Sequence, residues 1–212
     1  MKITGITRVK GTRYRVEVDG EYWNILDAEV LADFGFQPGL EVGEEALARA
    51  LEQAERRRAR ERAFYLLSSR DYSAGELLEK LSKNVSEEVA LQTVVRMQEL
   101  GFVNDGEYAG KLARSLLTVK RYGAFRAKQE MRRRHLSDEI IDAALEEAAF
   151  ESDPLEPLRE LIEKKYRRNL DTPEGRKKTI AALMRLGHSY SNIRQVLDEY
   201  PAAEVDEQEW EE

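Results

Sequence analysis

The fold is indicated most clearly by residues 121–145, RYGAFRAKQEMRRRHLSDEIIDAAL. This stretch predicts a basic helix, a tight turn and a second amphipathic helix that begins after Ser137, a residue type favoured at helix N-caps. Similar patterns occur about fifty residues upstream and about fifty residues downstream. We therefore expect a series of helical modules with a basic centre, which is typical of a partner-binding protein and not of an enzyme.

The N-terminal residues 1–43 predict a small β-rich element with a short helix. Between residues 2 and 26 apolar and polar side chains alternate, which is the period of a half-buried strand. Asp19-Gly20 has the composition of a two-residue hairpin turn, so two or three antiparallel strands are expected. A short helix over residues 28–34, capped by Asp27 and ended by Gly35, follows them.

The rest of the chain predicts a long lead-in helix and three helical repeats. The helix covers residues 44 to about 67 and begins the segment 44–104, which also holds repeat 1, while repeats 2 and 3 cover residues 105–152 and 153–201. The helix starts within the repeats are predicted from residues suited to caps and first turns. These are Ser73, Ser86, Asp105, Asp153-Pro154 and Thr172-Pro173.

Apolar positions recur in the same register in all three repeats. Leu81, Met131 and Leu183 occupy matching places in the second helices. The third helices match at Ala90/Val94/Met97, Ile141/Leu145/Ala148 and Ile193/Leu197/Tyr200. We expect a mainly α protein of tandem three-helix repeats in an elongated array, preceded by a small antiparallel hairpin or meander. The alternative is an irregular helical bundle whose segments share only general amphipathicity.

The C-terminal end of the sequence is strongly acidic. The formal net charge is −7, and six of the acidic residues lie after residue 203, so the remainder carries only −1. Residues 202–212 contain too little apolar surface to order themselves and are expected to form an acidic disordered tail. Its charge suggests competition with phosphate for basic surfaces elsewhere on the chain.

Composition and motifs exclude several classes of protein. The chain has no cysteine, so it has neither disulfides nor a thiolate metal site, and it lacks a long apolar run and a signal-peptide core. We expect a cytoplasmic monomer without cofactor or metal. No phosphate-binding glycine motif or His-Glu-x-x-His pair is present. The two histidines, His135 and His188, fall in turns, and the acidic pairs Glu87-Glu88 and Asp138-Glu139 fall in first helical turns, where they complement the helix dipole.

Clusters of basic residues are the most informative functional feature. They recur on the second helices of repeats 2 and 3, and we expect this basic face to bind phosphates or an acidic groove on a protein. The predicted binding residues are Arg121, Arg126, Lys128, Arg132, Arg133, Arg134, Arg176, Lys177 and Lys178. Arg56–Arg62 and residues 164–168 are expected to extend the face into a discontinuous stripe. Tyr122 and Phe125 are interpreted as core or turn anchors instead of platforms for stacking on bases.

The paired helices of each repeat also suggest a helix-turn-helix DNA reader. In that motif the start of the last helix contacts base edges. Here the first two repeats place Glu87-Glu88 and Asp138-Glu139 at that position, where they would repel phosphates. Only the third repeat, with Asn192, Arg194 and Gln195, has suitable side chains. Sequence-specific DNA recognition is therefore disfavoured.

Several spaced motifs resemble the RecX family over residues 60–200. They are Leu100-Gly101-Phe102-Val103-Asn104-Asp105, Tyr108-Ala109, Arg121-Tyr122-Gly123, the run from Ser137 to Leu145, and Leu183-Met184-Arg185-Leu186-Gly187 with Ile193. Ala127 departs from the pattern, because the family usually has a larger aliphatic residue there. The N-terminal strands and the acidic tail lie outside the core pattern.

The resemblance implies a regulator of the RecA recombinase that acts in DNA repair, recombination and the SOS response. Members of the family consist of three tandem three-helix repeats, bind RecA filaments on DNA in the filament groove, and typically restrain strand exchange and ATP hydrolysis. Two alternatives from other classes stay open. Tight binding to naked DNA would favour a stand-alone, non-specific DNA-binding module, and indifference to both DNA and recombinase would favour a scaffold for another protein.

Overall fold

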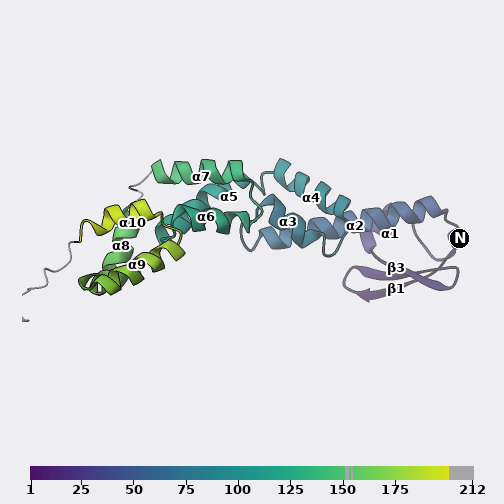
Figure 1. The fold of residues 1–212 in the computed structure, drawn as a ribbon. Helices are drawn as coiled ribbons and strands as arrows, with labels where there is room; N and C mark the ends of the chain where they lie inside the picture. Colours follow the sequence, from purple (N-terminus) through teal and green to yellow (C-terminus); the bar gives the residue numbers. More distant parts are fainter. Residues whose placement is uncertain (151–152, 154, 201–212) are drawn as a thin grey trace, which may run out of the picture. The chain divides into compact units, whose positions relative to one another are not determined.

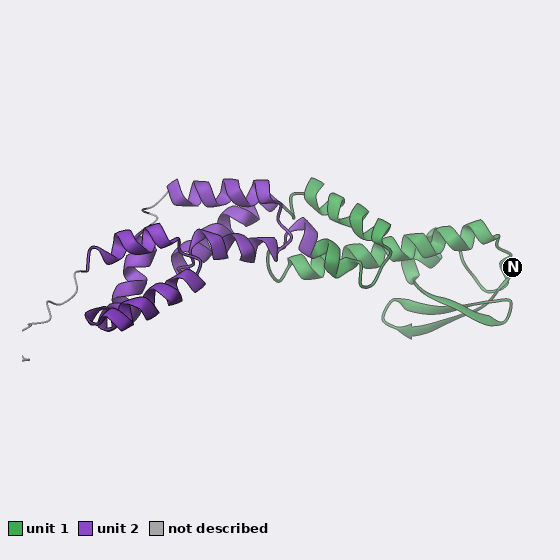
Figure 2. Ribbon diagram, viewed as in Figure 1, with its two compact units in different colours: residues 1–71, 77–103 green, residues 72–76, 104–212 purple. Residues whose placement is uncertain are grey.

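The computed structural model describes residues 1–150, 153 and 155–200, and these form a small sheet followed mainly by helices (Figure 1). They divide into two compact units (Figure 2). The first unit consists of residues 1–71 and 77–103, and the second consists of residues 72–76 together with those from 104 onward. The predicted acidic tail and Pro154 lie outside the described residues.

The sheet is a three-stranded antiparallel meander in the order β1-β2-β3. Its strands are β1 (Ile3–Lys10), β2 (Arg13–Val18) and β3 (Glu21–Asp27). Between β2 and β3, Asp19 and Gly20 have φ angles of 52° and 88°, which are the positive values that a type I′ turn requires. The helix α1 (Ala28–Asp33) follows directly, so the predicted strands and short helix are confirmed.

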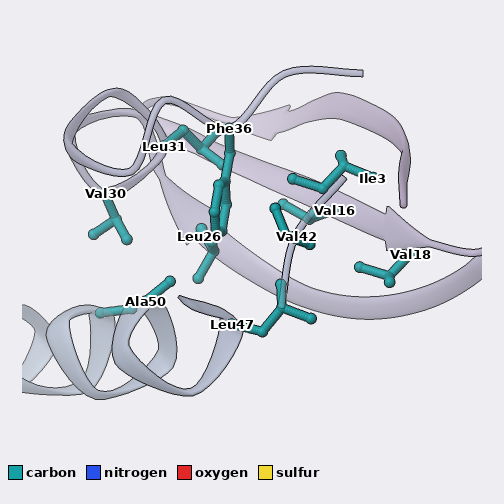
Figure 3. Close-up of a cluster of buried hydrophobic side chains, with 11 residues drawn as sticks. Ile3, Val16, Val18, Leu26, Val30, Leu31, Phe36, Val42, Leu47 and Ala50 are labelled. Atoms are coloured by element: carbon teal, nitrogen blue, oxygen red, sulfur yellow. The ribbon is translucent and has the colours of Figure 1, made fainter. Parts of the chain in front are cut away.

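The sheet is stabilised by packing against the long helix α2 (Glu44–Leu67). A three-stranded meander of this size has too little core to be stable alone. Figure 3 shows Val16 and Leu26 from the sheet facing the same cluster as Leu47 and Ala50 of α2. Ala50 is fully buried, and the absence of a larger side chain there allows helix and sheet to approach closely.

Repeat 1 consists of the C-terminal half of α2, α3 (Ala74–Leu81) and α4 (Glu87–Glu99). The α2 helix also contacts α4. The helix α3 begins in the second unit and continues in the first. Ser73 caps it as predicted, since its hydroxyl accepts from the Glu76 N–H at 3.1 Å. In return, the Glu76 carboxylate accepts from the Ser73 N–H.

Repeat 2 consists of α5 (Asp105–Arg114), the π turn η1 (Ser115–Val119), α6 (Ala124–Arg132) and α7 (Asp138–Phe150). The core is formed by Ala109, Ala113, Leu116, Ala127, Met131, Leu136, Ile141, Ala144 and Ala148. The predicted cap at Asp105 is wrong. Asn104 caps α5 by accepting from the Glu107 N–H, and the Asp105 carboxylate instead accepts from the Ala74 N–H at the start of α3.

Repeat 3 has the same order of helices. Its elements are α8 (Glu156–Leu161), the π turn η2 (Ile162–Tyr166), the 3-10 helix η3 (Arg167–Asp171), α9 (Pro173–Arg185) and α10 (Tyr190–Leu197). Thr172 caps α9 as predicted, and Pro157 lies in the first turn of α8. The core is formed by Leu155, Leu158, Leu161, Ile162, Leu170, Leu183, Ile193, Val196 and Leu197.

The predicted repeat register is confirmed by burial. Leu81, Met131 and Leu183 are at most 1% exposed, and Ala127, the departure from the family pattern, is fully buried. The interpretation of Phe125 as a core or turn anchor is wrong, because its side chain is 70% exposed; Met184, next to the buried Leu183, is also 52% exposed. Relative to Ala127, Phe125 is rotated by about 200° around α6, so it cannot share the buried face.

Repeats 2 and 3 are joined by backbone hydrogen bonds from the start of α6 to the end of α9. The Gly123 N–H donates to the Leu186 carbonyl at 2.9 Å, and the Phe125 N–H donates to the Gly187 carbonyl at 3.3 Å. Gly187 has a φ of 86°, which favours glycine. A Cβ atom on Gly123 would overlap the backbone of Gly187 and His188, so the two segments meet only because Gly123 has no side chain.

The start of α3 meets the end of α6 in the corresponding way. Counting from Met131 and Leu183, Arg134 corresponds to Leu186 and His135 to Gly187. The Ser73 hydroxyl donates to the Arg134 carbonyl, as the Gly123 N–H does to Leu186. His135 has a positive φ of 56°, like Gly187. We call these two contacts the repeat junctions.

We expect Gly123→Ala to destabilise the second unit by about 3 kcal/mol or more, because the new methyl group overlaps backbone atoms that cannot rotate away. Urea denaturation followed by circular dichroism measures the loss. Gly110→Ala is the matched control: it lies within α5, and its Cβ would meet only the Arg114 guanidinium at 3.6 Å. This control should be neutral or stabilising by up to about 1 kcal/mol. Equal stability of the two variants would contradict the close approach at Gly123.

Candidate partner-binding surface

Most of the predicted binding residues have carboxylate partners within the chain. Six of the nine form ion pairs, which is more than the sequence pattern suggested. These pairs are Arg121–Glu160, Lys128–Asp142, Arg132–Asp138, Arg133–Glu130, Arg134–Glu76 and Lys178–Glu174. The basic face is therefore not a uniform field of free charge, and each residue has to be assigned by what it contacts.

Arg134 contributes to the junction at the start of α3. Its guanidinium donates to the Glu76 carboxylate at 2.9 Å, and the Tyr108 hydroxyl donates to the same carboxylate at 3.1 Å. Glu76 is only 8% exposed, so it needs such partners to remain charged. Arg134 therefore stabilises the fold.

Arg121 has a comparable position beside α8. It has a φ of 54°, and its guanidinium is hydrogen-bonded to Glu160, which lowers the pKa of that carboxyl. The Arg121 carbonyl accepts from the His188 ring at 3.1 Å, and burial lowers the pKa of His188. Both interactions connect repeat 2 to repeat 3 through groups that flank the Gly123 junction.

Arg176 lies within repeat 3. Its guanidinium donates to the carbonyls of Leu170, Leu197 and Tyr200, so it ties the start of α9 to the end of α10. Three carbonyl acceptors leave this guanidinium few donors for a partner. Its neighbour Lys177 has no ion pair among the described residues, and Lys178 pairs with Glu174 one turn earlier.

Lys128 and Arg132 both pair with the start of α7. Lys128 lies 2.5 Å from the Asp142 carboxylate, and Arg132 forms two hydrogen bonds with Asp138 at 2.7 and 2.9 Å. The hydrogen bonds from Arg132 hold the pKa of Asp138 below its usual range. These exposed pairs contribute little to stability, but they offset the charge of both cations.

Arg126 and Arg133 are available to a partner. The Arg126 guanidinium lies 4.2 Å from the centre of the Tyr122 ring and donates to the Arg185 carbonyl at 3.4 Å. Arg133 is 72% exposed and pairs only with Glu130, one turn earlier on its own helix. Neither guanidinium makes an ion pair with another helix among the described residues.

Both arginines line a hollow beside the Gly123 junction. Two adjoining hollows of about 300 and about 440 Å³ share Phe125, Met184 and Gly187. The first is lined by Arg126, Arg133 and Arg185, and the second by Tyr190 and Asn192. We call this surface the junction groove and define it by Phe125, Arg126, Arg133, Met184, Arg185 and Tyr190.

The junction groove has the composition of a protein-binding site. Phe125, Met184 and Tyr190 are 70%, 52% and 56% exposed, and they gather at one place together with three arginines. Clustered exposed apolar side chains mark interaction sites, and aromatic residues, methionine and arginine are enriched in interfaces. The sequence pattern identified Arg126 and Arg133 but missed the other four. The helical period of α6 was the available signal, since it turns Phe125 away from Ala127 and toward Arg126 and Arg133.

Two other features, a metal site and a membrane-spanning helix, can be assessed in the part of the chain that the structure describes. There, no group of three or more histidine and carboxylate side chains is placed to hold a metal ion. No helix within residues 1–150 and 155–200 is long and apolar enough to cross a membrane.

Comparison with known proteins identifies relatives along most of the chain. Family models for the first, second and third three-helix domains of RecX match residues 59–97, 104–145 and 151–197. The Regulatory protein RecX of Caldanaerobacter subterraneus subsp. tengcongensis is 32% identical over 161 residues, which cover 76% of this chain and 81% of that protein. The same-named protein of Trichlorobacter lovleyi is 36% identical over 105 residues, 49% of this chain and 68% of that one.

Solved structures show the same fold. A crystal structure of regulatory protein RecX superposes with a TM-score of 0.67 at 23% identity and covers 93% of this chain and 98% of its own. The structure of RecX from Lactobacillus salivarius gives a TM-score of 0.61 at 23% identity, over 68% of this chain and 96% of its own.

The different roles of two adjacent arginines predict different effects on stability. Arg134→Gln should lower the free energy of unfolding by about 1–3 kcal/mol, because the buried Glu76 carboxylate loses a charged partner. Arg133→Gln removes the same charge from a side chain that is 72% exposed, and its effect should stay within about 0.5 kcal/mol. Chemical denaturation of both variants checks this. A larger loss for Arg133→Gln would reverse the structural assignment.

Proposed function

The chain belongs to the RecX family of regulatory proteins, and from that premise we propose that it binds the filament that RecA forms on DNA and restrains strand exchange and ATP hydrolysis by that filament. It acts by occupying a surface and catalyses no reaction of its own. Its partners are the recombinase and the DNA within the filament. It works in the cytoplasm as a monomer.

The junction groove is the observation that carries this proposal. Phe125 and Met184 offer apolar anchors for a protein surface, and Arg126, Arg133 and Arg185 surround them with positive charge. A protein filament wound on DNA presents both kinds of complement, namely side chains and phosphates. Electrostatic attraction would speed association and fix orientation, while the apolar anchors would slow dissociation.

The location of the groove suits an inhibitor that binds as a rigid body. Backbone hydrogen bonds hold the start of α6 to the end of α9, and the Arg121–Glu160 ion pair joins the segment before α6 to α8, so the groove exists before the partner arrives. A preformed surface loses little entropy on binding and gains affinity accordingly. The resemblance of the repeats to RecX domains supports the identity of the partner.

Two pairs of substitutions on α6 test the proposal with the same change of charge. We expect Arg126→Gln/Arg133→Gln to weaken binding to RecA–DNA filaments by roughly tenfold or more, because both guanidinium groups line the groove. Lys128→Gln/Arg132→Gln should change affinity by less than about threefold, since Asp142 and Asp138 already offset those cations. Fluorescence anisotropy measures affinity, and ATP turnover by RecA on single-stranded DNA measures inhibition.

The outcomes separate the proposal from its alternatives. Slower ATP turnover with the wild-type chain, relieved by the Arg126/Arg133 pair alone, supports it. Equal effects of the two variant pairs would show general electrostatic attraction and would rule out the groove. Tight binding to naked DNA with no effect on the recombinase would identify a stand-alone DNA-binding module. If the chain responds neither to DNA nor to recombinase, the result would favour the alternative that it is a scaffold for another protein.

A further inference from the structure

A second basic groove lies within the first unit and shares no residue with the junction groove. It has a volume of about 580 Å³ and runs between α2 and α4, next to Phe34. Four arginines and one glutamate line it, so its charged side chains sum to +3 in a chain whose net charge is −7. The lining arginines are Arg49, Arg56, Arg60 and Arg96.

Three of these arginines share one face of α2. Arg56 and Arg60 are seven and eleven residues beyond Arg49, which places each of them within about 20° of Arg49 around the helix. The arginines between Arg56 and Arg62, which were expected to belong to one basic stripe, therefore lie on different faces of α2. Arg58 lies about 180° from Arg49, and Arg57 pairs with Glu29 and Glu61. Arg96 of α4 completes the groove from its other side.

Carboxylates within the chain offset only part of the positive charge of this groove. Arg49 and Arg60 form no ion pair among the described residues. Arg56 pairs with Glu52 at 2.7 Å and Arg96 pairs with Glu99 at 2.7 Å, in each case along a single helix. All four of these paired side chains are more than half exposed, and such pairs contribute only about 0.3–0.5 kcal/mol. An incoming anion can therefore displace them readily.

The spacing suits a chain of phosphates more closely than an isolated anion. Arg49 and Arg60 are separated by about 16 Å along α2, a distance over which one strand of B-form DNA passes roughly five phosphates. Guanidinium groups bind phosphate oxygens through two parallel hydrogen bonds. An acidic protein segment fits less well, since protein interfaces depend on clustered apolar anchors and this groove offers only Phe34.

We propose that the groove formed by Arg49, Arg56, Arg60 and Arg96 binds the phosphodiester backbone of nucleic acid without reading its sequence. Arg49 and Arg56 precede residue 59, where the match to the first RecX domain begins, so two of the four arginines lie outside the matched domain. The inference goes beyond the filament proposal and does not depend on it, because it concerns naked nucleic acid and the first unit.

A matched pair of double variants of the full chain tests this site. Arg49→Gln/Arg60→Gln removes two cations from the groove, and Arg58→Gln/Arg62→Gln removes two from the opposite side of the same helix. Anisotropy with labelled single-stranded and duplex oligonucleotides, at several salt concentrations and without recombinase, measures affinity. We expect the first variant to bind roughly tenfold more weakly and its salt dependence to fall by about two in slope.

The remaining outcomes decide the proposal. The Arg58/Arg62 control should keep the wild-type slope, and two oligonucleotides of equal length but different sequence should bind equally. Arg49→Lys/Arg60→Lys keeps the charge and should retain most of the slope, which separates loss of contact from misfolding. No binding of the wild-type chain to naked DNA, or equal losses in both Gln variants, overturns the site. Loss of filament binding alone would identify a protein-docking groove and would also overturn it.

Discussion

The second unit depends on the close approach between the start of α6 and the end of α9. The first N–H groups of a helix and the last carbonyl groups have no partners within their own helix. Here the two sets satisfy each other, through the Gly123 N–H to Leu186 and the Phe125 N–H to Gly187. The charges of the two helix ends are opposite, so their dipoles add to the attraction. Only glycine allows the backbones to approach this far.

This junction also explains where the available surface lies. A helix that docks end-on turns one face toward its own repeat and leaves the other exposed beside the neighbouring repeat. Phe125 and Met184 lie on those exposed faces, on either side of Gly187. The surrounding basic residues then divide by role. Arg121 and Arg134 support junctions, whereas Arg126 and Arg133 face the hollow. The same contact that joins the repeats thus creates the binding surface proposed for the filament.

The sequence predicted the secondary-structure elements more accurately than the residues of the candidate partner-binding surface. Periodicity and cap residues located the strands, the lead-in helix and the matching buried positions, because these are local consequences of backbone geometry. Asp105 was assigned to the wrong helix end, since a carboxylate can cap a neighbouring helix and sequence spacing does not reveal which. Nine basic residues looked alike in sequence, yet Asp138 and Asp142 offset two of them across a turn. The prediction that the repeats form an elongated array, and the prediction that the basic face binds a partner, stay predictions.

Amide hydrogen exchange at Gly123 and Phe125 tests the end-on junction most directly. Amides in the first turn of a helix ordinarily exchange fast, because no carbonyl of their own helix accepts from them. We expect both amides to exchange as slowly as those in the middle of α6, since the carbonyls of Leu186 and Gly187 accept from them. Rapid exchange at these two positions, with the interior of α6 protected, would show that the two repeats are not joined in this way.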